Sequence, residues 1–87
     1  MINPNTGKRW KRSDLDTKTV LWFFSWPLDL RYPTGETIQA NTGAPEKVVW
    51  AAMEREENKG FIDYGTWLHG AWLTHEGWAE LARLTEK

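Results

Sequence analysis

The chain has 87 residues, of which 26% are charged, with seven tryptophans, no cysteine and a formal net charge of −1. This length predicts a single domain, and the absence of cysteine excludes disulfides and thiolate metal sites. The longest apolar run is too short to span a bilayer, and the N-terminus lacks a signal-peptide core. We therefore expect a cytoplasmic protein without a membrane partner.

The charge is unevenly spread along the chain. Residues 1–12 carry four cations and no acid, so they sum to +4 and the remaining residues sum to −5. Pro4 and Gly7 among polar residues predict that 1–13 is a flexible basic arm or loop. With Trp10 among its cations, the arm is either a solubilising tail or a segment that touches phosphate. The cations are Lys8, Arg9, Lys11 and Arg12.

A first helix is expected after the arm. Asp14 or Asp16 can cap it at the N-terminus, and Pro27 stops it near residue 26. Its apolar face has helical spacing and comprises Val20, Leu21 and Phe24. A connector rich in proline and glycine then extends to about residue 35.

Residues 34–60 predict two helices joined by a tight turn. In the first helix Ile38 and Ala40 are the expected apolar contacts, and Gly43 can take the positive φ that closes a helix C-terminus. The second helix covers 45–59, with Pro45 in its first turn and Lys59 near its negative end. Its buried stripe is expected to comprise Val48, Val49, Ala52 and Met53.

Residues 61–74 predict a β-hairpin with two possible registers. A two-residue turn at 69–70 places Trp67 opposite Trp72, whereas a longer loop over 65–70 moves the indoles towards the tip. In both registers Ile62 and Leu73 face the core. The default role of Trp67 and Trp72 is structural, with partner contact as the alternative.

A final helix follows the hairpin. Thr74 is its expected N-cap. Its inward face is predicted to comprise Trp78, Leu81 and Ala82. Burial is also the expected state of Trp22 and Trp26.

The order of these junctions resembles the winged helix-turn-helix domain of small bacterial and phage regulators. The stretch ETIQANTGAPEKVVWAAMEREENKGFIDYG has the family's T-G turn, helix-opening proline and K-G-apolar-I exit, and WLTHEGWAEL has its closing LT-x-x-G junction. The resemblance covers about residues 34–84. It implies a mainly α fold with a small β-hairpin (α+β), forming one winged helix-turn-helix domain over 14–87. A plain helical bundle with a hairpin is the alternative fold.

A second, shorter resemblance concerns the arm. NPNTGKRWKRSD, residues 3–14, is similar to N-P-x-T-G-K-x-aromatic-K-R-G-D segments of phage-encoded proteins, with Ser13 in place of the glycine. It indicates phage or mobile-element origin and carries no mechanism.

Nothing in the pattern predicts an enzyme. His69 and His75 lack metal-ligand spacing and a catalytic partner, so we expect turn and surface residues with no metal or cofactor. The acidic cluster is expected to be a solvated helix face with Lys59 nearby. Its members are Glu54, Glu56 and Glu57.

The resemblance implies binding to double-stranded DNA, with the helix over 45–59 in the major groove, and it allows for a homodimer. Lys47 would contact a guanine edge or phosphate, Glu46 a cytosine amine and Trp50 a thymine methyl. The arm would enter a minor groove or lie on phosphates. The expected DNA contacts are Lys8, Arg9, Lys11, Arg12, Lys47, Trp50 and Arg55, with Trp67 and His69 on the wing.

A protein-interaction module is the second functional hypothesis. The helix from Glu46 to Lys59 has a net charge of −1 and the hairpin has no lysine or arginine, which is unusual for a DNA reader. A winged-helix adaptor would instead bind a protein through exposed tryptophans. The expected anchors are Trp50, Trp67 and Trp72, with Tyr64 at the rim.

Overall fold

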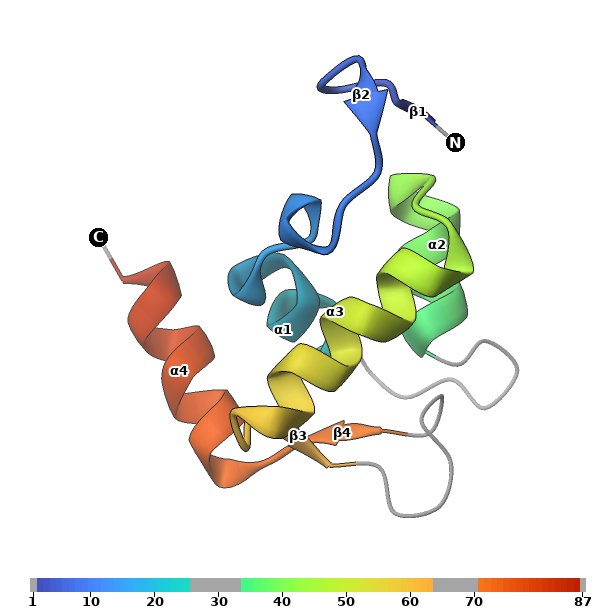
Figure 1. Cartoon of the computed structure of the whole chain (residues 1–87). Coiled ribbons are helices and arrows are strands. Elements are labelled where there is room, and N and C mark those ends of the chain that lie inside the picture. Colours follow the sequence, from blue (N-terminus) through green and yellow to red (C-terminus); the bar gives the residue numbers. More distant parts are fainter. Residues whose placement is uncertain (1, 26–33, 64–70, 87) are drawn as a thin grey trace.

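The computed structural model describes residues 2–25, 34–63 and 71–86. Within these ranges the chain is mainly helical and carries two small antiparallel sheets, which confirms the α+β class. The elements are β1 (Ile2–Asn3), β2 (Lys8–Arg9), the 3-10 helix η1 (Arg12–Asp14), α1 (Thr17–Phe24), α2 (Thr34–Thr42), α3 (Glu46–Asn58), β3 (Ile62–Asp63), β4 (Trp72–Leu73) and α4 (His75–Thr85). Figure 1 shows α3 running between the β1–β2 hairpin and the β3–β4 hairpin.

The four α-helices of the described residues enclose one core. Helix α1 packs against α2, α3 and α4, and α2 packs against α3. The core is formed by Leu15, Val20, Leu21, Phe23, Phe24, Ile38, Ala44, Val49, Ala52, Met53, Ile62, Ala71, Leu73 and Leu81. None of the helices in the described ranges is both long and apolar enough to cross a membrane.

The N-terminal segment differs from the expected arm or loop, because residues 2–9 form a hairpin. Buried Asn3 organises its turn: the side-chain Oδ1 accepts from Asn5 N at 2.9 Å, and the carbonyl accepts from Gly7 N at 2.8 Å. Gly7 has a φ of +71°, a left-handed conformation that favours glycine. The NPNTG sequence is therefore a turn-building motif, and the cations that follow it are attached to a folded element.

Helix α1 begins as predicted but exposes one residue expected to be buried. Asp16 caps it by accepting from Thr19 N at 2.8 Å, while Asp14 accepts from Lys11 N at η1. The predicted face of Val20, Leu21 and Phe24 is buried. The prediction for Trp22 was wrong, since this residue is 47% exposed. At 100° per residue, position 22 points away from that face; Trp26 and Pro27 lie outside the described residues.

The turn between α2 and α3 follows the sequence pattern closely. Gly43 has a φ of +77° and donates its N–H to the Gln39 carbonyl at 2.9 Å. Pro45 is the N-cap of α3. Ile38 is buried, but Ala40 is exposed, because two residues along a helix turn the side chain to the other side.

The expected stripe of α3 is largely confirmed. Val49, Ala52 and Met53 are fully buried in the core. Val48 is only partly buried and packs at the edge of the core. The stripe seats α3 inwards and leaves its opposite face outside.

The junction from α3 through the hairpin to α4 is held by backbone contacts. Gly60, with a φ of +82°, ends α3, and its carbonyl accepts from the Thr74 hydroxyl at 2.5 Å. That hydroxyl also accepts from Gly77 N at 3.0 Å, so Thr74 caps α4 as predicted. A Cβ at Gly77 would lie 1.9 Å from the Phe61 carbonyl oxygen, so only glycine fits without a shift. The LT-x-x-G pattern thus fixes α4 against the start of β3.

The β3–β4 register shows how Trp72 is paired. Ile62 pairs with Leu73 and Asp63 pairs with Trp72. The predicted pairing of Trp67 with Trp72 is therefore wrong, because Asp63 occupies the position opposite Trp72. The turn itself lies outside the described residues. Ile62 and Leu73 are buried as predicted, whereas Trp72 is 53% exposed, contrary to its default structural role.

Helix α4 presents a different inward face from the one predicted. Leu81 is buried as expected, but Trp78 is 51% exposed and Ala82 is exposed, so these two predictions were wrong. Gly77 lies against the Phe61 carbonyl, so the side of α4 that carries Gly77 faces the core. Leu81 lies one helical turn further along this side, and Trp78 is rotated about 100° away from it.

Candidate nucleic-acid interface

The N-terminal hairpin lies beside the start of α3. A hollow of about 230 Å³ separates them and is lined by Arg9, Trp10, Pro45, Lys47 and Val48. Trp10 is half-buried and packs against the core, which ties the end of β2 to the body of the protein. The basic segment is therefore next to Lys47, as DNA contact by both would require.

A second hollow lies between the hairpin turn and η1. It has a volume of about 310 Å³ and is lined by Thr6, Lys8, Arg9, Lys11, Ser13 and Asp14. The Asp14 carboxylate accepts from the Lys11 backbone N–H at 2.9 Å, so this acid is engaged by the backbone. Three cationic side chains and two hydroxyls make the hollow suited to an anion.

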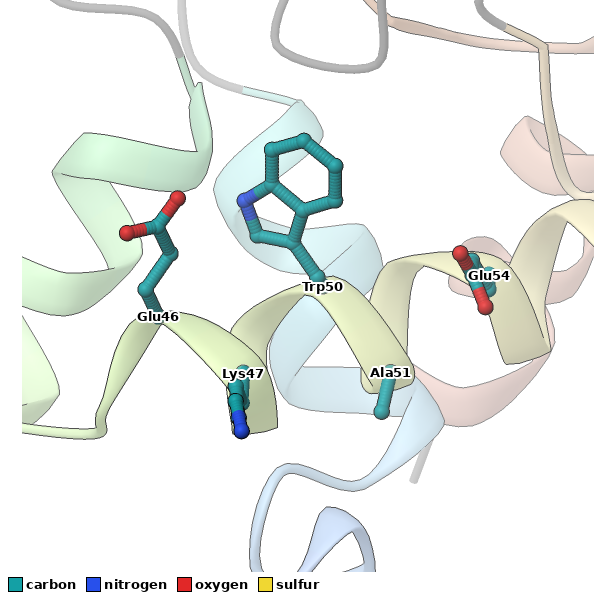
Figure 2. A pocket seen from close by; sticks show the side chains of 5 residues that line it. All are labelled: Glu46, Lys47, Trp50, Ala51 and Glu54. Atoms are coloured by element: carbon teal, nitrogen blue, oxygen red, sulfur yellow. The ribbon is translucent and has the colours of Figure 1, made fainter.

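The third hollow covers the outward face of α3. It has a volume of about 450 Å³ and is lined by Glu46, Lys47, Trp50, Ala51 and Glu54. Figure 2 shows the Trp50 indole projecting from the helix on the same side as Glu46, with Lys47 directed to the opposite side. Trp50 is 36% exposed, and Lys47 is exposed. Lys47 and Trp50 are two of the DNA contacts that the sequence predicts on this helix.

The cations from β2 to η1 and at the start of α3 are exposed. Among the described residues, none of them forms an ion pair with a carboxylate within 4.0 Å. They are Lys8, Arg9, Lys11, Arg12 and Lys47. Their charge is thus available to a bound anion.

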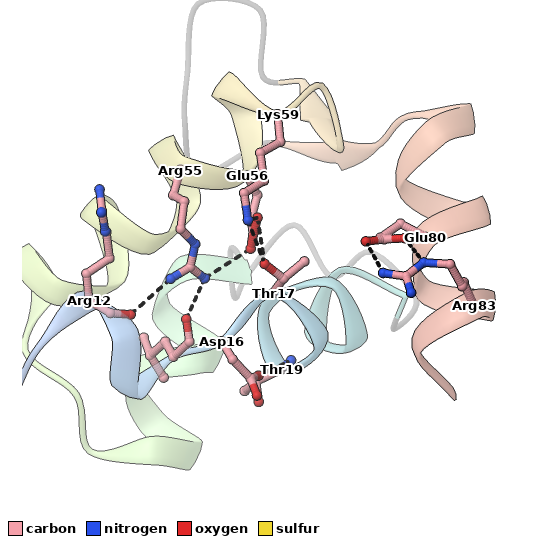
Figure 3. Close-up of polar contacts among 10 residues, drawn as sticks. Arg12, Asp16, Thr17, Thr19, Arg55, Glu56, Lys59, Glu80 and Arg83 are labelled. Atoms are coloured by element: carbon pink, nitrogen blue, oxygen red, sulfur yellow. Dashed lines mark hydrogen bonds and ion pairs between the residues drawn. The ribbon is translucent and has the colours of Figure 1, made fainter. Parts of the chain in front are cut away.

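Arg55 has a different role from the predicted DNA contact. Its Nη1 donates to the Arg12 carbonyl at 3.1 Å and its Nη2 donates to the Leu15 carbonyl at 2.5 Å. The same Nη2 lies 3.0 Å from Glu56 Oε2, and the side chain is only 15% exposed (Figure 3). Arg55 therefore ties α3 to η1 and is not part of the candidate interface.

Glu56 corrects the expectation of a solvated acidic face. Its side chain is fully buried, and Oε1 accepts from the Thr17 hydroxyl at 3.1 Å and lies 3.5 Å from Lys59 Nζ. The position continues the stripe of Ala52 and Met53 at helical spacing, which was the signal for burial. This carboxylate joins the end of α3 to the start of α1. Glu54 is exposed and Glu57 is half-buried.

The described residues add neither a metal site nor a predicted wing contact to this interface. In residues 2–25, 34–63 and 71–86 there is no group of three or more histidine, aspartate or glutamate side chains placed to hold a metal. His75 is exposed at the start of α4. The predicted wing contacts Trp67 and His69, and the rim residue Tyr64, lie outside the described residues.

Comparison with known proteins found no family model, no curated protein and no solved structure that matches the chain. The candidate interface therefore rests on the positions and contacts of its residues in this structure.

Proposed function

We propose that this protein binds double-stranded DNA as a small winged-helix regulator. The observation that carries the proposal is the hollow shared by Arg9, Trp10 and Lys47. It joins the basic N-terminal segment to the outward face of α3. A helix of unfavourable net charge is thereby supplied with cations from a neighbouring element.

The charge of the combined surface supports this function. Five exposed cations without carboxylate partners among the described residues can each neutralise a phosphate. If all five do so, log K falls with log salt with a slope of about −4.5. Binding with this salt dependence is mostly electrostatic. A homodimer would double the number of phosphate contacts.

The outward face of α3 supplies the groups for base contact. Lys47 matches a guanine edge or a phosphate, Glu46 a cytosine amine and Trp50 a thymine methyl. All three line one hollow on α3, with Lys47 on the side opposite Glu46 and Trp50. A helix in the major groove presents side chains of this kind to base edges and to phosphates. The β3–β4 hairpin takes the place of the wing.

Fluorescence anisotropy with a labelled mixed-sequence duplex of about two helical turns tests the proposal. We expect the wild type to bind with a steep dependence on salt between about 50 and 200 mM. The combined Lys8→Ala, Arg9→Ala and Lys11→Ala variant should bind much more weakly and lose about 3 from the magnitude of the slope.

Lys18→Ala is the matched control, because Lys18 is also exposed but lies on α1. It should leave the slope of the wild type unchanged. Absence of binding by the wild type at the lowest salt concentration ends the proposal.

A second candidate function is protein interaction, favoured by two exposed tryptophans on other elements. Trp72 on β4 is 53% exposed and Trp78 on α4 is 51% exposed. Exposed indoles are frequent anchors of protein interfaces. Capture of one defined protein from lysate by the wild type, lost in Trp72→Ala and Trp78→Ala, together with no DNA binding, would favour this function.

A further inference from the structure

The three hollows are connected through shared side chains. Arg9 lines both the hollow at η1 and the hollow at the start of α3, and Lys47 lines both the latter and the hollow on the outward face of α3. The surface is therefore a continuous path from the N-terminal hairpin to α3, with a cation at each passage between hollows.

The middle hollow alternates charged and apolar groups. Arg9 and Lys47 supply positive charge, while Trp10, Pro45 and Val48 supply apolar surface. A DNA strand has the complementary alternation, since each deoxyribose lies between two phosphates. Contacts to phosphate and sugar position a protein on the duplex without reading its sequence.

We propose that this path holds the backbone of one DNA strand, with Arg9 and Lys47 on neighbouring phosphates and Trp10 against the deoxyribose between them. The inference rests on the proposed function and adds Trp10 as a contact residue. It also divides the labour of the interface. The hairpin binds any sequence, and base discrimination is left to the outward face of α3.

The folded hairpin also decides between the two expected modes of arm binding. Its strands are paired, with Ile2 opposite Arg9 and Asn3 opposite Lys8, and Asn3 is buried. Entry into a minor groove as an extended arm would require these contacts to break. Contact with phosphates requires no such change.

Fluorine NMR of the full chain labelled with 5-fluorotryptophan tests this inference directly. The resonance that disappears in Trp10→Phe is assigned to Trp10. Addition of a mixed-sequence duplex should shift this resonance in the wild type. In Arg9→Ala the salt slope of binding should decrease in magnitude by about 1, equally on AT-rich and GC-rich duplexes.

The outcomes separate the two proposals. No duplex binding overturns both. Binding that leaves the Trp10 resonance in place, or binding that netropsin displaces from the minor groove of an AT-rich duplex, overturns the backbone path but keeps the proposed function. Binding with a shifted Trp10 resonance and no effect of netropsin supports the path.

Discussion

The two halves of α3 use charged side chains in opposite ways. In the first half, Lys47 is exposed on a face that meets two hollows. In the second half and at the C-cap, Arg55 and Lys59 are bound to Glu56 and to groups of η1 and α1. The difference arises from the neighbours that pack on each half. A cation in a helix of this kind is available for DNA only where no carboxylate or carbonyl of the same protein already holds it.

The largest expected loss of unfolding free energy comes from a substitution in the second half of α3. Glu56→Ala leaves the mostly buried Arg55 without its carboxylate, and loss of one partner of a buried pair costs about 3–5 kcal/mol. Urea denaturation should show this loss of unfolding free energy. Glu54→Ala, at an exposed position on the same helix, is the control and should change it by less than about 0.5 kcal/mol. Equal effects of the two variants would contradict the burial of Glu56 against Arg55 and Thr17.

The junction after α3 is expected to be the next most sensitive position. Gly77→Ala places a methyl group against the Phe61 carbonyl, and overpacking of this kind costs about 1–3 kcal/mol. A thermal melt should show a lower midpoint. Ala82→Ser on the exposed side of α4 is the control. An unchanged midpoint for Gly77→Ala would mean that α4 does not approach β3 this closely.

A substitution at the N-cap of α1 should cause a smaller loss of stability, and this loss should depend on pH. Asp16→Ala removes the cap of α1 and is expected to cost about 1 kcal/mol at neutral pH. Hydrogen bonds from Thr19 lower the pKa of Asp16 below its ordinary value of 3.8, assisted by Arg55 and Lys18. Because the folded pKa is the lower one, the stability that this carboxylate adds is complete above 3.8 and is lost as the pH falls through the folded pKa.

Denaturation of the wild type and Asp16→Ala over a pH series checks this expectation. The difference in unfolding free energy between the two proteins should shrink on acidification. A difference that stays constant or grows below pH 3.8 would contradict the role of the ionised cap.

The smallest effect on stability is expected from a lysine at the start of α3. Comparison with the lysine at the C-cap gives the clearest contrast between the two ends of this helix. Lys47→Ala should change the unfolding free energy by less than about 0.5 kcal/mol but reduce the salt slope of DNA binding by about 1. Lys59→Ala removes contacts to Glu56 and Thr17, so it should lower stability more and leave the slope unchanged. The reverse pattern would show that the halves have been assigned the wrong roles.

Features fixed by the local backbone could be predicted from the sequence. The caps at Asp16 and Thr74 and the helix end at Gly43 depend on a few neighbouring residues, and all three are confirmed. Side-chain environment was harder, because it depends on which elements pack over a helix. The exposure of Trp22 and Trp78 illustrates this. The sequence pattern does not indicate whether an apolar residue next to a buried stripe is itself buried or exposed.

The candidate interface was predictable only in part. Its cations could be listed from the sequence, but their proximity to α3 could not, because it follows from a hairpin whose strands are only two residues long. The sequence also did not show that Arg55 is bound within the protein and is therefore not one of these available cations. Its partners at Arg12 and Leu15 lie about forty positions away in the chain.

Amide NMR of the labelled full chain during titration with a mixed-sequence DNA duplex tests the division of α3 most directly. We expect shift changes at Lys8 to Arg12 and at Glu46 to Ala51, with little change at Arg55 to Lys59. Shifts centred on Trp78 in α4, or no shifts at the lowest salt concentration, would contradict this division.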